Sequence, residues 1–316
     1  LYEWRVMARE TFRIPGVTAL DIRDNQNRIR IGIEKPSVQS AIEKELARLG
    51  VPRAAVVFEE HPYVRFHKTL RDKFRPTEGG IKTTRTSTGG GECTLGFNAY
   101  REYVGGGPVF VTNSHCTRFP GEMESTVFYQ FGERIGVEIS DPEYYDELVN
   151  PHCTPSNYRC RYSDAALVAY DSKSLQRFGY VAQTAYASPD AGSIDVSSTN
   201  PRFRIVEERN ALMGERLFKM GQRSGWTYGL VVGTCDDYPT NHSTSDGHPI
   251  ALLCQDAFEG GVTDGDSGSP VFATVSGNDI AIYGILWGGN SSSAKFSSMV
   301  LIEAEVGDLK TYGIEP

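Results

Sequence analysis

The sequence predicts a mainly β protein preceded by a small α+β domain, and three observations lead to this fold class. Residues 93–316 contain many short apolar runs separated by turn residues, which is typical of β-barrels and sandwiches. Residues 1–76 combine alternating strand patterns with one helical pattern. The chain of 316 residues also holds six cysteines, an even number that falls into sequence-local pairs.

The N-terminal segment has the pattern of a β-β-α-β unit. Isoleucines alternate with arginine or glycine in the second expected strand, which predicts one buried and one solvated face. The helix begins after an N-cap serine and ends at a glycine. In order, the expected elements are a strand at 17–22, a strand at 29–33, a helix between Ser37 and Gly50, and a strand at 54–58.

Residues 77–92 are small, polar and rich in glycine, which is typical of a flexible linker and a site of proteolytic nicking. We therefore expect a domain boundary near Pro76, with a small α+β domain at 1–76 and a larger β domain at 77–316. Arg75 and Arg85 are candidate cleavage points in this region.

Charge is distributed unevenly along the chain. Residues 1–92 carry 17 Lys and Arg against 12 Asp and Glu, whereas residues 93–316 carry 15 against 28. The two parts should attract each other, which favours docking of the N-terminal domain onto the rest of the chain. Basic residues are scattered among acidic ones, so we expect no nucleic-acid partner. No apolar run is long enough to span a membrane.

The cysteines form three local pairs, Cys93/Cys116, Cys153/Cys160 and Cys235/Cys254. No Cys-x-x-Cys spacing with histidine partners is present, so we expect no metal site. Three disulfides in an oxidising compartment are the favoured interpretation; six free buried thiols in a cytosolic enzyme are the alternative.

A candidate nucleophile lies in the stretch Gly265-Asp266-Ser267-Gly268-Ser269-Pro270. A serine hydroxyl needs a base, and the base needs a group that orients it. His115 follows the apolar run 109–111, and Asp164 opens the run 165–170. The chain order His, Asp, Ser is one of those known for serine hydrolase triads.

Three motifs together resemble the chymotrypsin-fold serine proteases, and most of all their bacterial branch of streptogrisins and α-lytic protease. They are Thr-x-x-His-Cys at 112–116, Asp-Ala-Ala-Leu at 164–167 and Gly-Asp-Ser-Gly-x-Pro at 265–270. The resemblance covers the chain from about Glu78 onward. It implies two six-stranded antiparallel β-barrels, with His115 and Asp164 on the first barrel and Ser267 on the second.

The resemblance also implies a role for each residue. His115 would be the general base and acid, Asp164 would orient it, and the amides of Gly265 and Ser267 would form the oxyanion hole. The alternatives are a structural histidine, a turn serine and a plain strand-opening acid, with Asp171 as the nearest competitor of Asp164.

Asp266 needs a partner if it is buried. In the bacterial branch a basic side chain supplies it, and the matching position here is Lys219. The sequence has Phe218 and Tyr228 where that branch often has a disulfide, so an aromatic pair is expected to replace it.

Substrate specificity rests on a smaller set of residues. The resemblance implies that Gly261, six residues before Ser267, lies at the floor of the specificity pocket. Trypsin-like enzymes have an acid there, and the bare glycines predict an open pocket for a bulky apolar side chain. Asp264 and nearby acids could instead favour a basic one. The expected pocket residues are Gly261, Asp264, Trp287, Gly288 and Gly289.

These features predict a secreted serine endopeptidase that acts on peptide or protein substrates without a metal or organic cofactor, and that is made as a monomeric zymogen. The N-terminal domain would resemble a pro-domain that assists folding and blocks the active site; a permanent accessory domain is the alternative. A silent binding protein with this domain docked in the cleft, and an esterase, remain as other candidate functions.

Overall fold

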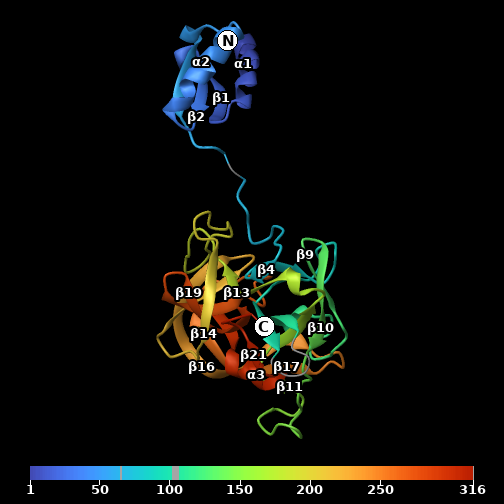
Figure 1. Ribbon diagram of the computed structural model, residues 1–316. Helices are drawn as coiled ribbons and strands as arrows, with labels where there is room; N and C mark the ends of the chain where they lie inside the picture. Colours follow the sequence, from blue (N-terminus) through green and yellow to red (C-terminus); the bar gives the residue numbers. More distant parts are fainter. Residues whose placement is uncertain (65, 102–106, 316) are drawn as a thin grey trace. The chain divides into compact units, whose positions relative to one another are not determined.

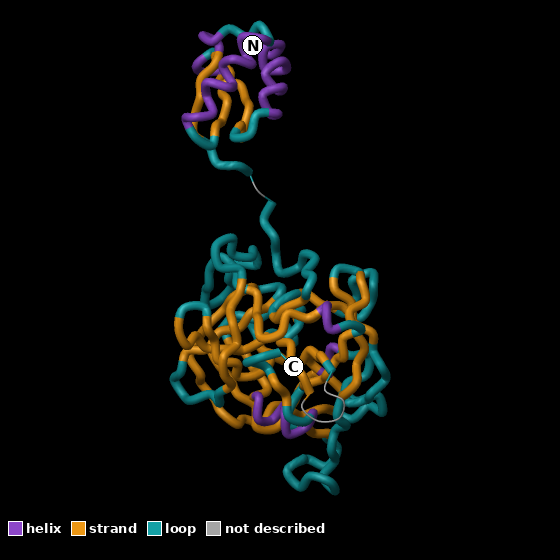
Figure 2. Tube along the Cα trace, in the orientation of Figure 1, coloured by secondary structure: helices purple, strands orange, loops and turns teal. Residues whose placement is uncertain are grey.

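The computed structural model describes residues 1–64, 66–101 and 107–315, and it divides the chain into two compact units. Unit 1 is Leu1–His67 and unit 2 is Lys68–Pro316. Unit 1 mixes helices and strands, whereas unit 2 consists almost entirely of strands and loops (Figure 2). None of the helices in the described ranges is long and apolar enough to cross a membrane.

Unit 1 is a three-stranded sheet with helices packed against it (Figure 1). β1 and β2 are antiparallel, and β2 and β3 are parallel, so the chain must cross over between β2 and β3 and does so through α2. The strand-strand-helix-strand order agrees with the sequence prediction, while the first helix was not predicted. The elements are α1 (Tyr2–Ala8), β1 (Val17–Arg23), β2 (Arg28–Ile33), α2 (Gln39–Arg48) and β3 (Val56–Glu60).

The units divide earlier in the chain than Pro76, because the segment after His67 packs into unit 2. Leu70 and Phe74 are buried in the core of unit 2 together with Ile81. The stretch 77–92 is not a free linker either, since it contains two short strands and the first residue of a third, and all three pair within unit 2. Its glycine-rich composition resembles a linker, but the threonines between the glycines have the β propensity of a strand.

Unit 2 contains two large sheets (Figure 1). One has the strand order β21-β7-β8-β12-β10-β9-β5-β6, and the other has the order β11-β17-β16-β15-β18-β19-β14-β13-β4, with β20 paired to β17 and β19. The strands of the first sheet are β5 (Lys82–Thr84), β6 (Glu92–Thr94), β7 (Phe97–Arg101), β8 (Pro108–Asn113), β9 (Val127–Gln130), β10 (Glu133–Ser140), β12 (Ala165–Tyr170) and β21 (Leu309–Lys310). Those of the second are β4 (Thr77–Gly79), β11 (Arg159–Arg161), β13 (Gln176–Ala182), β14 (Arg202–Glu208), β15 (Arg216–Gly221), β16 (Gly225–Ser243), β17 (Pro249–Glu259), β18 (Pro270–Ser276), β19 (Asp279–Gly289) and β20 (Ser293–Ser298).

The predicted architecture of two β-barrels is confirmed, but the sheets differ in detail from six antiparallel strands each. Short edge strands enlarge both sheets, and β4, β11 and β14 each make a parallel pairing. The largest apolar cluster takes side chains from both sheets, for example Phe97 and Phe110 from the first and Phe272 and Ile285 from the second. This shared core fixes the barrels against each other. The helix α3 (Met299–Val306) buries Met299, Ile302 and Val306.

Candidate active site

The register of β8 against β12 brings His115 and Asp164 together. Ala165 pairs with Asn113, so the residues just beyond these strand ends lie side by side. The amide of Ser114 donates to the carbonyl of Asp164 at 2.8 Å, which closes the junction. His115 lies in the short 3₁₀ helix Ser114–Cys116 that follows β8, so its ring projects beyond the sheet.

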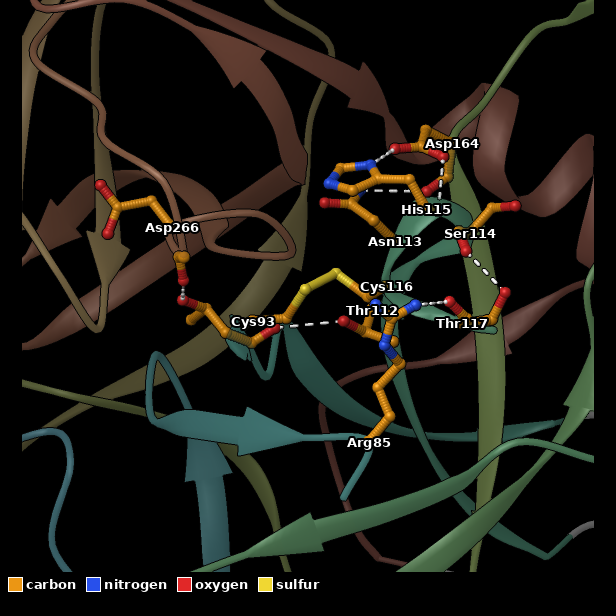
Figure 3. Close-up of a disulfide and its surroundings, with 12 residues drawn as sticks. Arg85, Cys93, Thr112, Asn113, Ser114, His115, Cys116, Thr117, Asp164 and Asp266 are labelled. Carbon is orange, nitrogen blue, oxygen red and sulfur yellow. Dashed lines mark hydrogen bonds and ion pairs between the residues drawn. A yellow bond between two sulfur atoms is a disulfide. The ribbon is translucent and has the colours of Figure 1, made fainter. Parts of the chain in front are cut away.

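Asp164 holds His115 through two contacts (Figure 3). Its Oδ2 lies 2.5 Å from Nδ1 of the imidazole, and its Oδ1 accepts the backbone N–H of His115 at 3.2 Å. The Asp164 side chain is 4% exposed and that of His115 is 17% exposed. A carboxylate on Nδ1 keeps the proton on that nitrogen and leaves Nε2 free to accept one. Asp171, the competing acid, is exposed and pairs with Arg134 instead.

A buried ionic network supports the loop that carries Asp164. Arg161 is fully buried and donates to Asp141 at 2.8 Å, to Glu305 at 3.2 Å and to the carbonyl of Ala165 at 2.8 Å. Glu305 of α3 also accepts the Ser163 hydroxyl at 2.6 Å. Burial raises the pKa of Asp141, while the nearby Arg161 cation opposes that rise.

The loop that carries Ser267 is attached to the first barrel by Thr94. The Thr94 amide donates to the Ser267 carbonyl at 2.7 Å, and the Thr94 hydroxyl donates to the Gly265 carbonyl at 2.9 Å. Gly268 has a φ of +88°, and a Cβ there would lie 2.2 Å from the Thr94 carbonyl oxygen. Only glycine permits this close approach, which holds the Ser267 loop against Thr94, the residue that follows Cys93 of the disulfide Cys93–Cys116.

Asp266 points away from His115, into the second barrel (Figure 3). Its Oδ2 lies 3.3 Å from the Lys219 Nζ, and the two side chains are 1% and 0% exposed. The same carboxylate accepts the amides of Arg223 at 2.9 Å and Thr263 at 3.1 Å and the hydroxyl of Ser224 at 2.5 Å. Burial lowers the pKa of Lys219, and the Asp266 carboxylate opposes that shift. The expected pairing of Asp266 with Lys219 is therefore present.

Two backbone amides beside Ser267 are available to a ligand. Within the described ranges, the N–H groups of Gly265 and Ser267 donate to no protein acceptor, and both residues line the same cavity. Gly265 has a φ of +95°, a conformation that glycine adopts without strain. Its carbonyl accepts the Gln222 side-chain amide at 3.2 Å, and this contact turns the carbonyl away from the cavity.

A cavity of about 640 Å³ brings the predicted triad together. Its lining includes His115, Asp164 and Ser267, although among the described residues no hydrogen bond joins Ser267 to His115. Such bonds are often long in unliganded enzymes and tighten when substrate binds. Three loops and strand ends from distant parts of the chain therefore meet in one cavity.

The predicted specificity pocket is only partly as expected. Asp264, Trp287, Gly288 and Gly289 line the cavity, but Gly261 does not. A Cβ at Gly261 would lie 1.8 Å from the carbonyl oxygen of Asp190, so this residue faces a neighbouring loop.

Val262 occupies the space beside Gly289, whereas the space beside Gly288 is open. A Cβ at Gly289 would lie 2.7 Å from a methyl carbon of Val262. The Val262 amide also donates to the Asn290 carbonyl at 3.0 Å, which joins the two walls. Val262 therefore narrows this wall at Gly289, and the expected pocket for a bulky apolar side chain stays a prediction.

The sequence prediction missed His242, which it placed on a surface loop. The His242 ring stacks on the His115 ring with centroids 5.2 Å apart and planes 23° from parallel. Thr94 and Glu305 were also missed. Thr94 follows a cysteine expected in a disulfide next to the histidine, and that spacing was a usable signal; His242 and Glu305 lie far from every motif.

The three predicted disulfides are confirmed. Their pairs are Cys93–Cys116, Cys153–Cys160 and Cys235–Cys254, and no free cysteine remains in the described ranges. The aromatic pair Phe218 and Tyr228 is also present as a cross-strand pair, with ring centroids 5.6 Å apart.

The two barrels and a cavity lined by Ser267, His115 and Asp164 are the features to compare with proteins of known structure. The fold is similar to that of a bacterial protease. A Nocardiopsis protease is 18% identical, covers 75% of this chain and 98% of its own, and superposes with a TM-score of 0.50. Protease A of Thermobifida fusca is 15% identical, covers 74% of this chain and 96% of its own, and gives a TM-score of 0.48. A chymotrypsin of Cellulomonas bogoriensis is 18% identical, covers 75% of this chain and 98% of its own, and gives the same TM-score of 0.48. No family model and no curated protein matches the sequence.

Proposed function

We propose that this protein is a serine endopeptidase that cleaves peptide bonds through an acyl-enzyme on Ser267. One observation carries the proposal: Ser267, the Asp164-bound His115 and two unpaired amides line one cavity. A serine hydrolase needs these three components, namely a nucleophile, an oriented base and donors for the oxyanion.

The chemistry follows from the positions of these groups. Nε2 of His115 takes the Ser267 hydroxyl proton while Oγ attacks the substrate carbonyl carbon. The amides of Gly265 and Ser267 donate to the oxyanion that develops. His115 then protonates the leaving amine. A water that His115 deprotonates next attacks the acyl carbon, which breaks the ester bond to Ser267, releases the acid and regenerates the serine. Asp164 holds the imidazolium in place throughout.

The substrate would lie along the end of β19. Leu286 still bonds to Gly268 and Ser269, at 2.8 Å each. Beyond Leu286, β20 is the one ladder partner of this strand in the described ranges, and Trp287, Gly288 and Gly289 line the cavity. An extended peptide can add to such an edge, which favours peptides over small esters.

We expect a small apolar side chain on the substrate residue whose carbonyl carbon is attacked, because Val262 fills the space beside Gly289. We expect Val262→Ala to raise kcat/KM about tenfold for peptides with leucine at this position relative to alanine. The measurement is a pair of peptides that differ only there. An unchanged ratio would show that Val262 does not limit this subsite.

Unit 1 would act as a folding aid or inhibitor that proteolysis removes, and secretion fits the three disulfides. The buried Lys219–Asp266 pair supports a preformed oxyanion hole that needs no new N-terminus. Inhibition would then depend on unit 1 covering the cleft rather than on the conformation of the Ser267 loop.

A peptide library with mass-spectrometric readout tests the proposal on the full chain, before and after limited proteolysis. We expect cleavage that increases after proteolysis, with a mock purification as the control for contaminating proteases. Hydrolysis of nitrophenyl esters alone would favour an esterase. No hydrolysis of either substrate in both preparations would favour a binding protein and overturn the proposal.

A further inference from the structure

His242 is the one cavity residue whose ring stacks directly on a triad side chain among the described residues. It comes from the long hairpin formed by β16 and β17, far in sequence from His115. Desolvation, with a smaller contribution from the nearby His115, lowers the pKa of His242, and Asp164 opposes that shift. A neutral ring can stack on the catalytic imidazole without repelling the charge that forms there.

The hairpin is held over the cavity by several contacts, so the position of His242 follows from the fold. β17 pairs in parallel with β11, whose last residue lies three positions before Asp164. His248 Nδ1 lies 3.1 Å from the Asn157 carbonyl oxygen, across the same junction. Within the hairpin, the His242 amide donates to the Thr240 hydroxyl at 3.2 Å, and the disulfide Cys235–Cys254 joins the two strands.

Strand geometry determines which substrate side chain would meet this ring. In an extended peptide successive side chains point to opposite faces. In the proposed function, the residue at the scissile carbonyl directs its side chain toward Val262 and Gly289. The residue before it would then direct its side chain to the other face of the peptide, and we expect the wall of His115 and His242, which lines the same cavity, on that face.

We propose that His242 determines specificity at this neighbouring subsite by covering the face of His115 and leaving room for glycine or another small residue only. The inference rests on the proposed function, since it concerns the same cleft. It concerns the size of the side chain before the scissile residue, which neither Val262 nor the triad determines. A larger side chain would have to displace His242 from its contact with His115.

The test uses the full chain and two peptides that differ only in glycine or leucine before the scissile residue. We expect the wild type to prefer glycine, and His242→Ala to lower the glycine-to-leucine ratio of kcat/KM by about tenfold or more. His242→Phe, which keeps a ring, should retain most of the preference. His152→Ala, which removes an exposed histidine outside the cavity, serves as the matched control and should leave the ratio unchanged.

The ratio is internal to each preparation, so partial misfolding of a variant does not alter it. A wild type that prefers leucine, or an unchanged ratio in His242→Ala, overturns this inference and leaves the proposed function standing. A wild type that cleaves no library peptide overturns the proposed function, and this inference with it.

Discussion

Replacing Ser267 with alanine should lower kcat on a peptide substrate by about six powers of ten, the loss typical of removing a serine nucleophile. The hydroxyl that forms the acyl-enzyme is gone, and only the two amides and substrate binding remain to stabilise the transition state. Residual catalysis should stay about three powers of ten above the uncatalysed rate. The measurement is single-turnover hydrolysis of a library-derived peptide.

Asp164→Asn separates the role of the aspartate from that of the serine. The asparagine amide would donate to Nδ1 of His115, which places the ring proton on Nε2 and prevents it from accepting the serine proton. We expect kcat to fall by about four powers of ten. Asp171→Asn is the control, because the Asp171 side chain forms an exposed pair with Arg134 and does not line the cavity. Equal losses in both variants would contradict the assignment of Asp164.

Lys219→Met should destabilise unit 2 by about 3–5 kcal/mol, because it leaves the Asp266 carboxylate buried without its cation. The methionine fills similar space, so the loss reports charge rather than volume. Lys73→Met is the matched control, since its pair with Glu133 is exposed and should contribute less than about 1 kcal/mol. Urea unfolding of the full chain, followed by near-UV circular dichroism, gives both values.

A double variant distinguishes the buried charge from general damage to the barrel. Lys219→Met combined with Asp266→Asn removes both charges and should recover part of the lost stability. Because Asp266 lies between Gly265 and Ser267, the single variant should also lose activity at temperatures where it remains folded. A fully stable and active Lys219→Met would contradict the view that this pair holds the loop in place.

The residues of the candidate triad were predictable because short local motifs carry them, and the disulfides because their cysteines form sequence-local pairs. His115, Asp164 and Ser267 each stand in a motif that depends on neighbouring residues alone. The same holds for Lys219, which lies on a strand with a regular apolar pattern. These parts of the site follow from local sequence and a resemblance to known proteases.

The walls of the site were less predictable because they depend on long-range packing. Gly261 was expected at the pocket floor from a residue count, but the backbone there packs on Asp190. His242 reaches His115 only because two hairpin strands extend well beyond their barrel. Residues 77–92 have the composition of a linker, and only their pairing with distant strands shows that they belong to the sheets.

The central claim is that Ser267 is a nucleophile activated by His115, and labelling with a fluorophosphonate probe tests it most directly. After limited proteolysis of the full chain, peptide mapping by mass spectrometry should find the probe on Ser267 in the wild type and no probe in His115→Ala. Absence of label on Ser267 in the wild type, or equal labelling in the two proteins, would contradict the claim.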